Sequence, residues 1–382
     1  MTAADGHKPR ASTTGGAASD IAERTGGAVT RASGPCLHPP RTIELRTVRL
    51  CLIGFGSVAR AFCALLAQQE RVLADAHGLC VLVTAAGTRR GSLLAPDGIT
   101  PAAVLEAVGG APAPPQAARP ASELLRASGA DVLVELTVME HDFAPVSTGH
   151  VLEALELGMD VLTANKGPIA WNWDRVAAAA KANGRRVRFE STVMDGLPVF
   201  SLLELALPDC RLIGFEAVFN ATSNSIVDAM GQGETFADAL ARMQAAGVAE
   251  ADPANDVDGW DAAFKAAALA NVAMGAGITP ATIARESLRE VAPARITQAR
   301  AAGKRLRLVT SVSRGADGAV HGCVRAAELD IDHPLAALGG DSLGALLHTD
   351  LMADVFIAER NGLVPQTAYG VYADLLHLCR GS

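Results

Sequence analysis

Short apolar runs alternate with amphipathic stretches through the first half of the chain. The continuous runs predict buried strands at 48–53, 79–86, 131–136, 160–163 and 186–190. Helical periodicity between these runs predicts helices at 57–69, 147–157 and 173–183. Regular alternation of strand and helix is typical of a mostly parallel sheet that is covered by helices on both faces. We therefore expect an α/β fold with a doubly wound parallel sheet.

The pattern changes beyond Gly196, where apolar and polar residues alternate as in strands with one open face. Such segments lie at 211–219, 304–313, 321–328 and 343–357. Helical patterns occupy 222–230, 235–247, 259–275, 281–289 and 366–378. We expect a first domain at 46–195, a second α+β domain at 196–363, and a final helix within 364–382 that completes the first domain.

Residues 1–45 lack apolar periodicity and are rich in Ala, Gly, Ser, Thr, Pro and Arg. This composition cannot offset the entropy cost of ordering, so we expect a disordered extension. A transit peptide fits less well, because Asp5, Asp20 and Glu23 dilute the basic character. An over-long start codon is a third interpretation, and the sequence does not separate the three.

Bulk composition narrows the class of protein. The 382 residues carry a formal net charge of -8, which argues against nucleic-acid binding because that requires a basic surface. No apolar stretch is long enough to predict a membrane span. Seven cysteines, an odd number, form no metal-ligand spacing, so we interpret them as reduced thiols of a cytoplasmic protein.

A glycine-rich turn follows the first predicted strand. It reads Gly54-Phe55-Gly56-Ser57-Val58 and leads directly into a helix. In dinucleotide-binding folds the first glycine permits the tight turn, and the second lets the backbone approach the pyrophosphate. The context predicts a Rossmann-type domain that binds NAD or NADP. The alternative is a glycine turn between a strand and a helix with no ligand.

The end of the second strand bears on the choice of cofactor. An acidic residue there would bind the ribose of NAD, but the chain has Thr88, Arg89 and Arg90 instead. These residues could bind a 2′-phosphate and so favour NADP, or they could form a solvated basic loop. Thr137 and Asn165 also follow predicted strands, and we count them among the cofactor-binding residues.

Two further segments carry candidate chemistry. Lys166 follows the 160–163 strand at the edge where doubly wound sheets bind ligands, and a lysine there can donate a proton to a carbonyl. Asp261 and Lys265 are four residues apart on one face of a predicted helix. The run from Glu250 to Asp261 is acidic and suits recognition of an ammonium group. A surface lysine, a surface ion pair and an acidic surface loop are the plainer alternatives.

These segments together resemble the homoserine dehydrogenase family across about residues 47–380. The two most specific runs are Thr163-Ala164-Asn165-Lys166-Gly167-Pro168 and the stretch from Ala249 to Lys265. The resemblance implies a dinucleotide-binding domain, a mixed-sheet substrate and dimerisation domain, and a homodimer. It also implies NAD(P)H-dependent reduction of a small amino-acid aldehyde, aspartate semialdehyde, to homoserine. No regulatory domain is evident after the core, so the chain resembles the short catalytic form.

The resemblance also implies roles for individual residues. Lys265 and Lys166 match the two lysines beside the reacting carbonyl, and Lys166 also matches a cofactor contact. Glu250 and Asp261 match the acidic residues that hold the substrate and orient its amino group.

The remaining matches concern the cleft and a cation. Asn220 and Thr222 match positions that line the active-site cleft near the nicotinamide. Glu190 matches the carboxylate of a monovalent-cation site for Na⁺ or K⁺. The other ligands of that site are main-chain oxygens near Val193 and Asp195.

The chain departs from the family at three places. Ala221 replaces a frequent glycine, the 191–196 segment lacks extra glycines, and residues 358–365 replace a Gly-rich loop that lies against the cofactor. A paralogue that acts on another short aldehyde or hydroxy acid therefore remains an alternative. So does a catalytically weak relative that acts as a binding protein, although the presence of Lys166, Glu250, Asp261 and Lys265 speaks against it.

Overall fold

A computed structural model describes residues 45–109, 116–245, 253–340, 342–360 and 362–380. The first half of the chain forms a six-stranded sheet in the order β3-β2-β1-β4-β5-β6. Its strands are β1 (Arg46–Ile53), β2 (Leu79–Thr88), β3 (Gly91–Ile99), β4 (Val132–Glu135), β5 (Asp160–Thr163) and β6 (Val187–Arg188). All neighbouring pairs are parallel except β2 and β3. The predicted doubly wound parallel sheet is confirmed.

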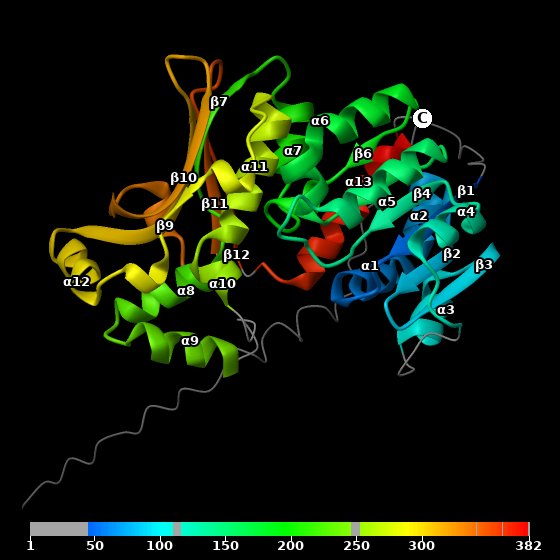
Figure 1. The fold of residues 1–382 in the computed structure, drawn as a ribbon, viewed down its shortest axis with the longest axis horizontal. Helices are drawn as coiled ribbons and strands as arrows, with labels where there is room; N and C mark the ends of the chain where they lie inside the picture. Colours follow the sequence, from blue (N-terminus) through cyan, green and yellow to red (C-terminus); the bar gives the residue numbers. More distant parts are fainter. Residues whose placement is uncertain (1–44, 110–115, 246–252, 341, 361, 381–382) are drawn as a thin grey trace, which may run out of the picture. The chain divides into compact units, whose positions relative to one another are not determined.

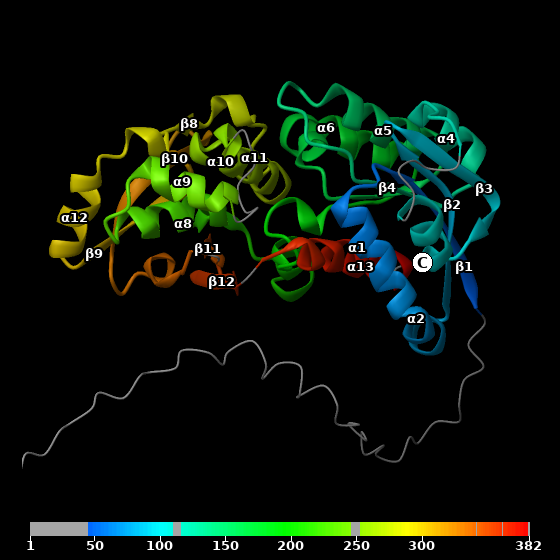
Figure 2. The same ribbon diagram turned by 90° about the horizontal axis from the view of Figure 1, so that it is seen from below.

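Alternation along the strands explains why helices cover both faces of this sheet. On β1, Leu50 and Leu52 belong to one apolar cluster, whereas Cys51 and Ile53 belong to the opposite one. The first cluster packs under α1 (Ser57–Gln68) and α13 (Val364–Arg380). The second packs under α4 (Ala121–Ser128), α5 (Pro145–Glu156) and α6 (Lys166–Ala182). Figure 2 shows the two layers on opposite sides of the strands.

Smaller elements complete this half. They are α2 (Glu70–His77), α3 (Pro101–Val104) and the π-helical turn η2 (Leu105–Gly109). Strand β3 was not expected from the sequence, because Gly91–Ile99 contains Pro96 and Gly98 and shows weak alternation. It forms as the antiparallel partner of β2 through a tight turn.

The second half forms another six-stranded sheet, in the order β12-β11-β7-β9-β10-β8. Figure 1 labels its strands β7, β9, β10, β11 and β12. Its strands are β7 (Leu212–Val218), β8 (Ala284–Arg285), β9 (Lys304–Arg314), β10 (Val320–Asp330), β11 (Ser342–Thr349) and β12 (Asp354–Arg360). Its helices are α8 (Ala221–Met230), α9 (Phe236–Ala245), α10 (Ala254–Val257), α11 (Trp260–Met274) and α12 (Pro293–Ala301). The apolar α11 packs against one face of the sheet. This mixed α+β arrangement is the one expected.

Short helical turns join these elements. They are η3 (Glu190–Thr192), α7 (Val199–Ser201), η4 (Leu202–Ala206), η5 (Pro280–Thr282), η6 (Leu288–Glu290) and η7 (Pro334–Ala337). The described residues from Leu45 onward form one compact unit.

Three element predictions were wrong. The 281–289 segment is not a helix, because Ala284 and Arg285 pair with β10 and the Glu286 N–H donates to Val324 O at 2.9 Å. The 343–357 segment is two strands, because Thr349 N–H donates to Ala353 O at 2.8 Å and closes a turn. The predicted 186–190 strand is shorter, since Glu190 begins a 3₁₀ turn.

Several compositional expectations can be compared with the described residues. No helix among them has both the length and the apolar character that crossing a bilayer needs. Six described cysteines are free thiols: Cys51, Cys63, Cys80, Cys210, Cys323 and Cys379. The predicted extension at 1–45 lies almost entirely outside the described residues.

Candidate functional site

The turn between β1 and α1 has the shape that a pyrophosphate needs. Gly54 has a φ of +91°, and a Cβ added there would lie 2.4 Å from the carbonyl carbon of Leu136, so only glycine fits. Gly56 is the N-cap of α1, and a Cβ added there would meet no atom within 4 Å. No side chain caps this helix and its first turn, which holds Ser57 and Val58, is free of acidic residues. The helix N-terminus therefore faces open space with its partial positive charge unopposed.

The predicted phosphate-binding residues Thr88, Arg89 and Arg90 form the β2–β3 turn. This turn lies beside the glycine turn, because Gly54 N–H donates to Gly87 O at 3.0 Å. The Thr88 hydroxyl holds the turn itself, since it accepts from Arg90 N–H and donates to Gly91 O at 2.9 Å. Arg89 and Arg90 are exposed and remain available to an anionic group.

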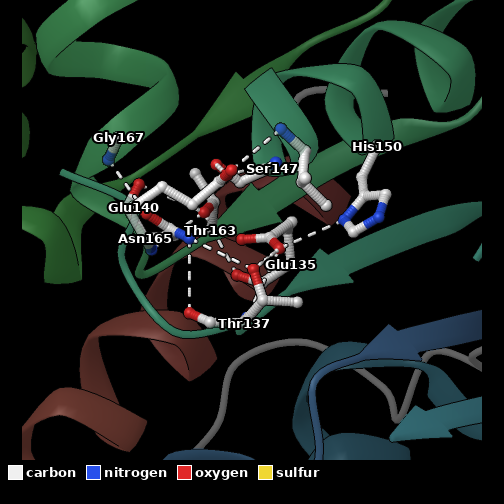
Figure 3. A network of polar contacts seen from close by, with 9 residues as sticks. Glu135, Thr137, Glu140, Ser147, His150, Thr163, Asn165 and Gly167 are labelled. Atoms are coloured by element: carbon white, nitrogen blue, oxygen red, sulfur yellow. Dashed lines mark hydrogen bonds and ion pairs between the residues drawn. The ribbon is translucent and has the colours of Figure 1, made fainter. Parts of the chain in front are cut away.

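Thr137 and Asn165 are brought together at the carboxyl ends of β4 and β5 (Figure 3). Asn165 Nδ2 donates to both the main-chain oxygen and the hydroxyl of Thr137, each at 3.2 Å. Asn165 Oδ1 accepts from Gly167 N–H at 2.9 Å and so caps α6. This cap fixes where α6 begins, and Lys166 is its first residue.

Lys166 and Lys265 share one carboxylate. Lys166 Nζ lies 3.2 Å from Asp261 Oδ1, and Lys265 Nζ lies 3.0 Å from Asp261 Oδ2. Lys265 also donates to the main-chain oxygen of Phe219 at 2.6 Å. The side chain of Lys265 is 11% exposed and that of Lys166 is 22% exposed, so Lys166 is the more accessible of the two.

Burial and charge act in opposite directions on this trio. Burial alone would raise the pKa of Asp261, but Lys265 and Lys166 hold that pKa below its ordinary value. Burial alone would lower the pKa of Lys265, but Asp261, Asp195 and Asp256 hold it above its ordinary value. The carboxylate is therefore ionised and Lys265 is protonated at neutral pH. The side chains of Lys166 and Lys265 therefore share one carboxylate, in a site to which Asp195 and Asp256 add further acidic groups.

Asn220 fixes the other side of Asp261. Its Nδ2 lies 3.1 Å from Asp261 Oδ2 and 2.7 Å from Asp256 Oδ1. Its Oδ1 accepts from Ser223 N–H at 2.8 Å and caps α8, so the amide is held from both ends. Thr222 is buried in the first turn of α8. The predicted Glu250 lies outside the described residues.

Asp195 and Glu359 add two carboxyl groups near Lys265. Asp195 has a φ of +49° and accepts from the Thr367 hydroxyl at 3.1 Å. A Cβ added at Gly362 would lie 2.6 Å from Asp195 Oδ2 and 3.7 Å from Glu359 Cδ, so the two groups are neighbours. Burial and the charge of Asp195 raise the pKa of Glu359 to about 7, against the effect of Lys265. Glu359 also lines a cavity of about 390 Å³.

The residues predicted to bind a cation follow β6. The carboxylate of Glu190 accepts from Phe200 N–H at 2.8 Å, from Ser201 N–H at 2.9 Å and from the Ser201 hydroxyl at 2.5 Å. Its own N–H donates to Asp374 at 2.8 Å. Burial raises the pKa of both carboxyl groups, that of Asp374 to about 8. Val193 is fully buried.

The predicted residues thus form a connected series. Gly54 contacts the Thr137 segment, Thr137 bonds Asn165, and Lys166 follows Asn165 and reaches Asp261. Sequence reasoning missed Glu135, which bonds Thr137, because it was read as part of an apolar run. It also did not single out Asp256 or Asp374. The described residues contain no group of three or more His, Cys, Asp or Glu side chains arranged to hold a metal ion.

Comparison with known proteins identifies two matching segments. Residues 54–190 match the NAD-binding domain of homoserine dehydrogenases, and residues 198–376 match the homoserine dehydrogenase family. Both matches contain parts of the site, because Lys166 falls in the first and Lys265 in the second.

Individual relatives agree along most of the chain. The NAD(+)-dependent homoserine dehydrogenase of Pseudomonas canavaninivorans is 32% identical over 336 residues, which are 86% of this chain and 96% of the relative. A homoserine dehydrogenase structure from Thiobacillus denitrificans is 26% identical with a TM-score of 0.77, covering 88% of this chain and 74% of its own. A hyperthermophilic archaeal homoserine dehydrogenase in complex with NADPH is 28% identical with a TM-score of 0.74, covering 88% and 99%.

Proposed function

This chain belongs to the homoserine dehydrogenase family of NAD(P)-dependent oxidoreductases, and we propose that it reversibly reduces L-aspartate 4-semialdehyde to L-homoserine. The pathway would be threonine and methionine biosynthesis. The observation that carries the proposal is the sharing of the Asp261 carboxylate by Lys166 and Lys265. It brings two ammonium groups to the same carboxylate, near the carboxyl ends of β4 and β5.

The lysines would act on the carbonyl oxygen of the substrate. Negative charge grows on that oxygen during reduction, and an ammonium group beside the oxygen stabilises that charge. A proton then passes from an Nζ atom to the oxygen to complete the alcohol. Asp261 keeps Lys265 protonated and aimed, because it raises the pKa of that lysine and bonds it at 3.0 Å.

The substrate's own ammonium group would bind the acidic side of the site. Asp261 and Asp256 converge on Asn220, and Thr222 lies in the helix that Asn220 caps. We propose that these residues, with Glu250, hold the amino group. Asp258 is not part of this set, because it bonds Arg289 and Ser287 instead.

Bound NAD(P)H supplies the hydride. The residues at the β1–α1 turn fit its pyrophosphate, since Gly56 and the uncapped α1 leave open space at a helix N-terminus. We propose that Arg89 and Arg90 bind a 2′-phosphate and favour NADP. The relatives do not decide this preference, because one is NAD(+)-dependent and another is in complex with NADPH.

A monovalent cation is a further proposal. The main-chain oxygens of Val193 and Asp195 are of the type that Na⁺ and K⁺ prefer. The Glu190 carboxylate already accepts three hydrogen bonds, so its role would be to fix the segment as well as to add charge. Rates in KCl, NaCl and tetramethylammonium chloride at equal ionic strength test this proposal, and equal rates in all three salts would contradict it.

We also propose a homodimer in the cytoplasm. Phe356 on the edge strand β12 is 40% exposed, and Leu351 and Met352 in the adjoining turn are 68% and 57% exposed. Neighbouring apolar side chains of this kind suit burial against a second copy. Six free thiols among the described residues suit a reducing compartment. Light scattering of wild type and Phe356→Asp tests the dimer, which the variant should weaken.

A paralogue that acts on another short aldehyde is the second candidate. The observation that favours it is Glu359, a carboxyl group that stands where the family has a Gly-rich loop and faces Asp195 and Lys265. Its charge would change which substrate groups the site accepts.

Rescue of a strain that requires homoserine for growth separates these candidates. We expect the wild-type gene to restore growth and a Lys265→Ala gene to fail at equal protein level. No growth with abundant wild-type protein would contradict the proposal and favour the paralogue.

A further inference from the structure

Glu135 ends β4 and is fully buried. One carboxylate oxygen, Oε1, accepts from Thr137 N–H at 3.3 Å and makes a short hydrogen bond with the Thr137 hydroxyl. His150 Nδ1 lies 3.4 Å from the same oxygen. The other oxygen, Oε2, is buried and has no hydrogen-bond partner among the described residues. A buried carboxyl group with one oxygen that lacks a hydrogen bond lowers the stability of the fold, so its presence here calls for an explanation.

A series of hydrogen bonds connects Glu135 to the start of α6. The Thr137 hydroxyl has a single proton, which it donates to Glu135, so its lone pairs are left to accept from Asn165 Nδ2 at 3.2 Å. With Nδ2 held there, Asn165 Oδ1 points at Gly167 N–H, 2.9 Å away, and starts α6. Figure 3 shows this series between the strand ends. Lys166 lies between the capping residue Asn165 and Gly167, whose N–H donates to the cap.

The same carboxylate also holds the segment behind the glycine turn. A Cβ added at Gly54 would lie 2.6 Å from Thr137 N and 2.4 Å from Leu136 O, so the two backbones are in close approach. The main-chain nitrogen of Thr137, which lies close to Gly54, carries the N–H that donates to Glu135. Displacing Thr137 would therefore disturb the turn that fits the pyrophosphate.

We propose that Glu135 is a positioning residue. Through its hydrogen bonds to Thr137, and from Thr137 to Asn165, it fixes the positions of Lys166 and of the glycine turn relative to each other. The inference rests on the proposed function, because it assigns Lys166 a part in the reaction. Glu135 acts as a hydrogen-bond acceptor in this role. Its charge is not required, because Oε1 alone receives the donors of Thr137.

The test compares Glu135→Leu with Glu135→Gln. Leucine removes the acceptor, whereas glutamine keeps an oxygen at Oε1. The matched control is Asp160→Leu, because Asp160 is a buried carboxylate at the start of β5, whereas Lys166 follows the end of that strand. Its oxygens accept from the main-chain N–H of Arg186 at 2.7 Å and from the Arg186 side chain at 3.1 Å. The readouts are kcat and KM for aspartate semialdehyde and the Kd of NADPH by fluorescence.

We expect Glu135→Leu to lower kcat at least about 30-fold, with a smaller change in KM, and to raise the Kd of NADPH about tenfold. Glu135→Gln should stay within about threefold of wild type in both kcat and Kd, and Asp160→Leu within about twofold. The inference is overturned if Glu135→Leu keeps wild-type kcat and Kd, if Glu135→Gln loses as much as Glu135→Leu, or if Asp160→Leu loses as much.

Thr137→Val provides an independent test should Glu135→Leu fail to fold. It removes the hydroxyl that links Glu135 to Asn165 and keeps the volume. We expect it to lower kcat at least about tenfold and to raise the Kd of NADPH, because the link from Glu135 to Asn165 is broken. Wild-type kcat and Kd in Thr137→Val would contradict the inference. If wild type lacks the proposed activity, the Kd values still decide the role of Glu135.

Discussion

Lys166 Nζ lies 3.2 Å from Asp261 Oδ1, although Lys166 begins the helix after β5 and Asp261 lies in the first turn of α11. Lys265 bonds the other oxygen of the same carboxylate. One carboxylate thus joins a residue at the edge of the nucleotide-binding sheet to a residue of the helix packed on the second sheet. The predictions below test what each partner contributes.

Lys265→Ala should reduce kcat by about 10²- to 10⁴-fold, because it removes a cation beside the developing oxyanion and a proton donor. The Kd of the cofactor should change far less, since no part of the glycine turn is altered. Lys181→Ala, which removes an exposed lysine of α6, is the control and should leave both unchanged. Wild-type turnover in Lys265→Ala would refute the assigned role.

Asp261→Asn should shift the pH dependence of reduction. Asp261 is the main charge that raises the pKa of Lys265 against burial, so its removal lowers that pKa. The ammonium form would then be lost at lower pH, and the alkaline limb of the kcat profile should move to lower pH. In wild type the raised pKa places this limb above pH 10.5, so stopped-flow profiles between pH 6 and 10 should show the limb only in the variant. A variant profile without the limb would show that Lys265 does not titrate in catalysis.

Alanine substitutions at the two glycines of the β1–α1 turn should have different effects, one on stability and the other on cofactor binding. Gly54→Ala forces a Cβ against Leu136 at a φ of +91°, so the free energy of unfolding should fall by about 2–4 kcal/mol. Gly56→Ala meets no protein atom and should cost at most about 1 kcal/mol as an N-cap change. It should nevertheless raise the Kd of NADPH about tenfold or more. Urea unfolding and fluorescence titration measure the two effects, and unaltered binding by Gly56→Ala would contradict the placement of the pyrophosphate.

Asp374→Asn should flatten the pH dependence of stability. Burial raises the pKa of Asp374 from 3.8 to about 8, so the folded protein holds a proton that the unfolded chain releases. The contribution of Asp374 to stability is therefore greatest below about pH 4 and declines as pH rises to about 8, by at most about 1.4 kcal/mol per pH unit. Asparagine lacks this proton and can still accept from Glu190 N–H. Urea midpoints at pH 5, 6.5 and 8 should fall less in the variant than in wild type.

The control for that prediction is Asp174→Asn, an exposed carboxylate of α6. It should follow wild type at all three pH values. Equal slopes for Asp374→Asn and wild type would mean that Asp374 is ionised in the folded protein throughout this range.

Local sequence patterns predicted the first sheet and its glycine turn, because both features depend on residues that are neighbours in the sequence. Gly54 and Gly56 stand directly between an apolar strand and a helix, and Asp261 and Lys265 are one helical turn apart. By contrast, strand β8 at Ala284–Arg285 exists only because β10 pairs with it, and no local period marks it.

The meeting of Lys166 with Asp261 could not be derived from spacing, because it depends on how two distant helices pack. Family resemblance supplied both residues as candidates, and the structure supplied the contact. Glu135 escaped notice for a related reason: a carboxylate at the end of an apolar strand has no local signature, and its importance lies in bonds to Thr137 and His150.

The initial rate of NADPH oxidation after addition of L-aspartate 4-semialdehyde to the purified protein tests the central claim most directly. The measurement is repeated with NADH, and the product is identified by mass spectrometry. We expect homoserine to form in equal amount to the cofactor oxidised, faster with NADPH than with NADH. Oxidation of neither cofactor, by protein that still binds NADPH, would contradict the account.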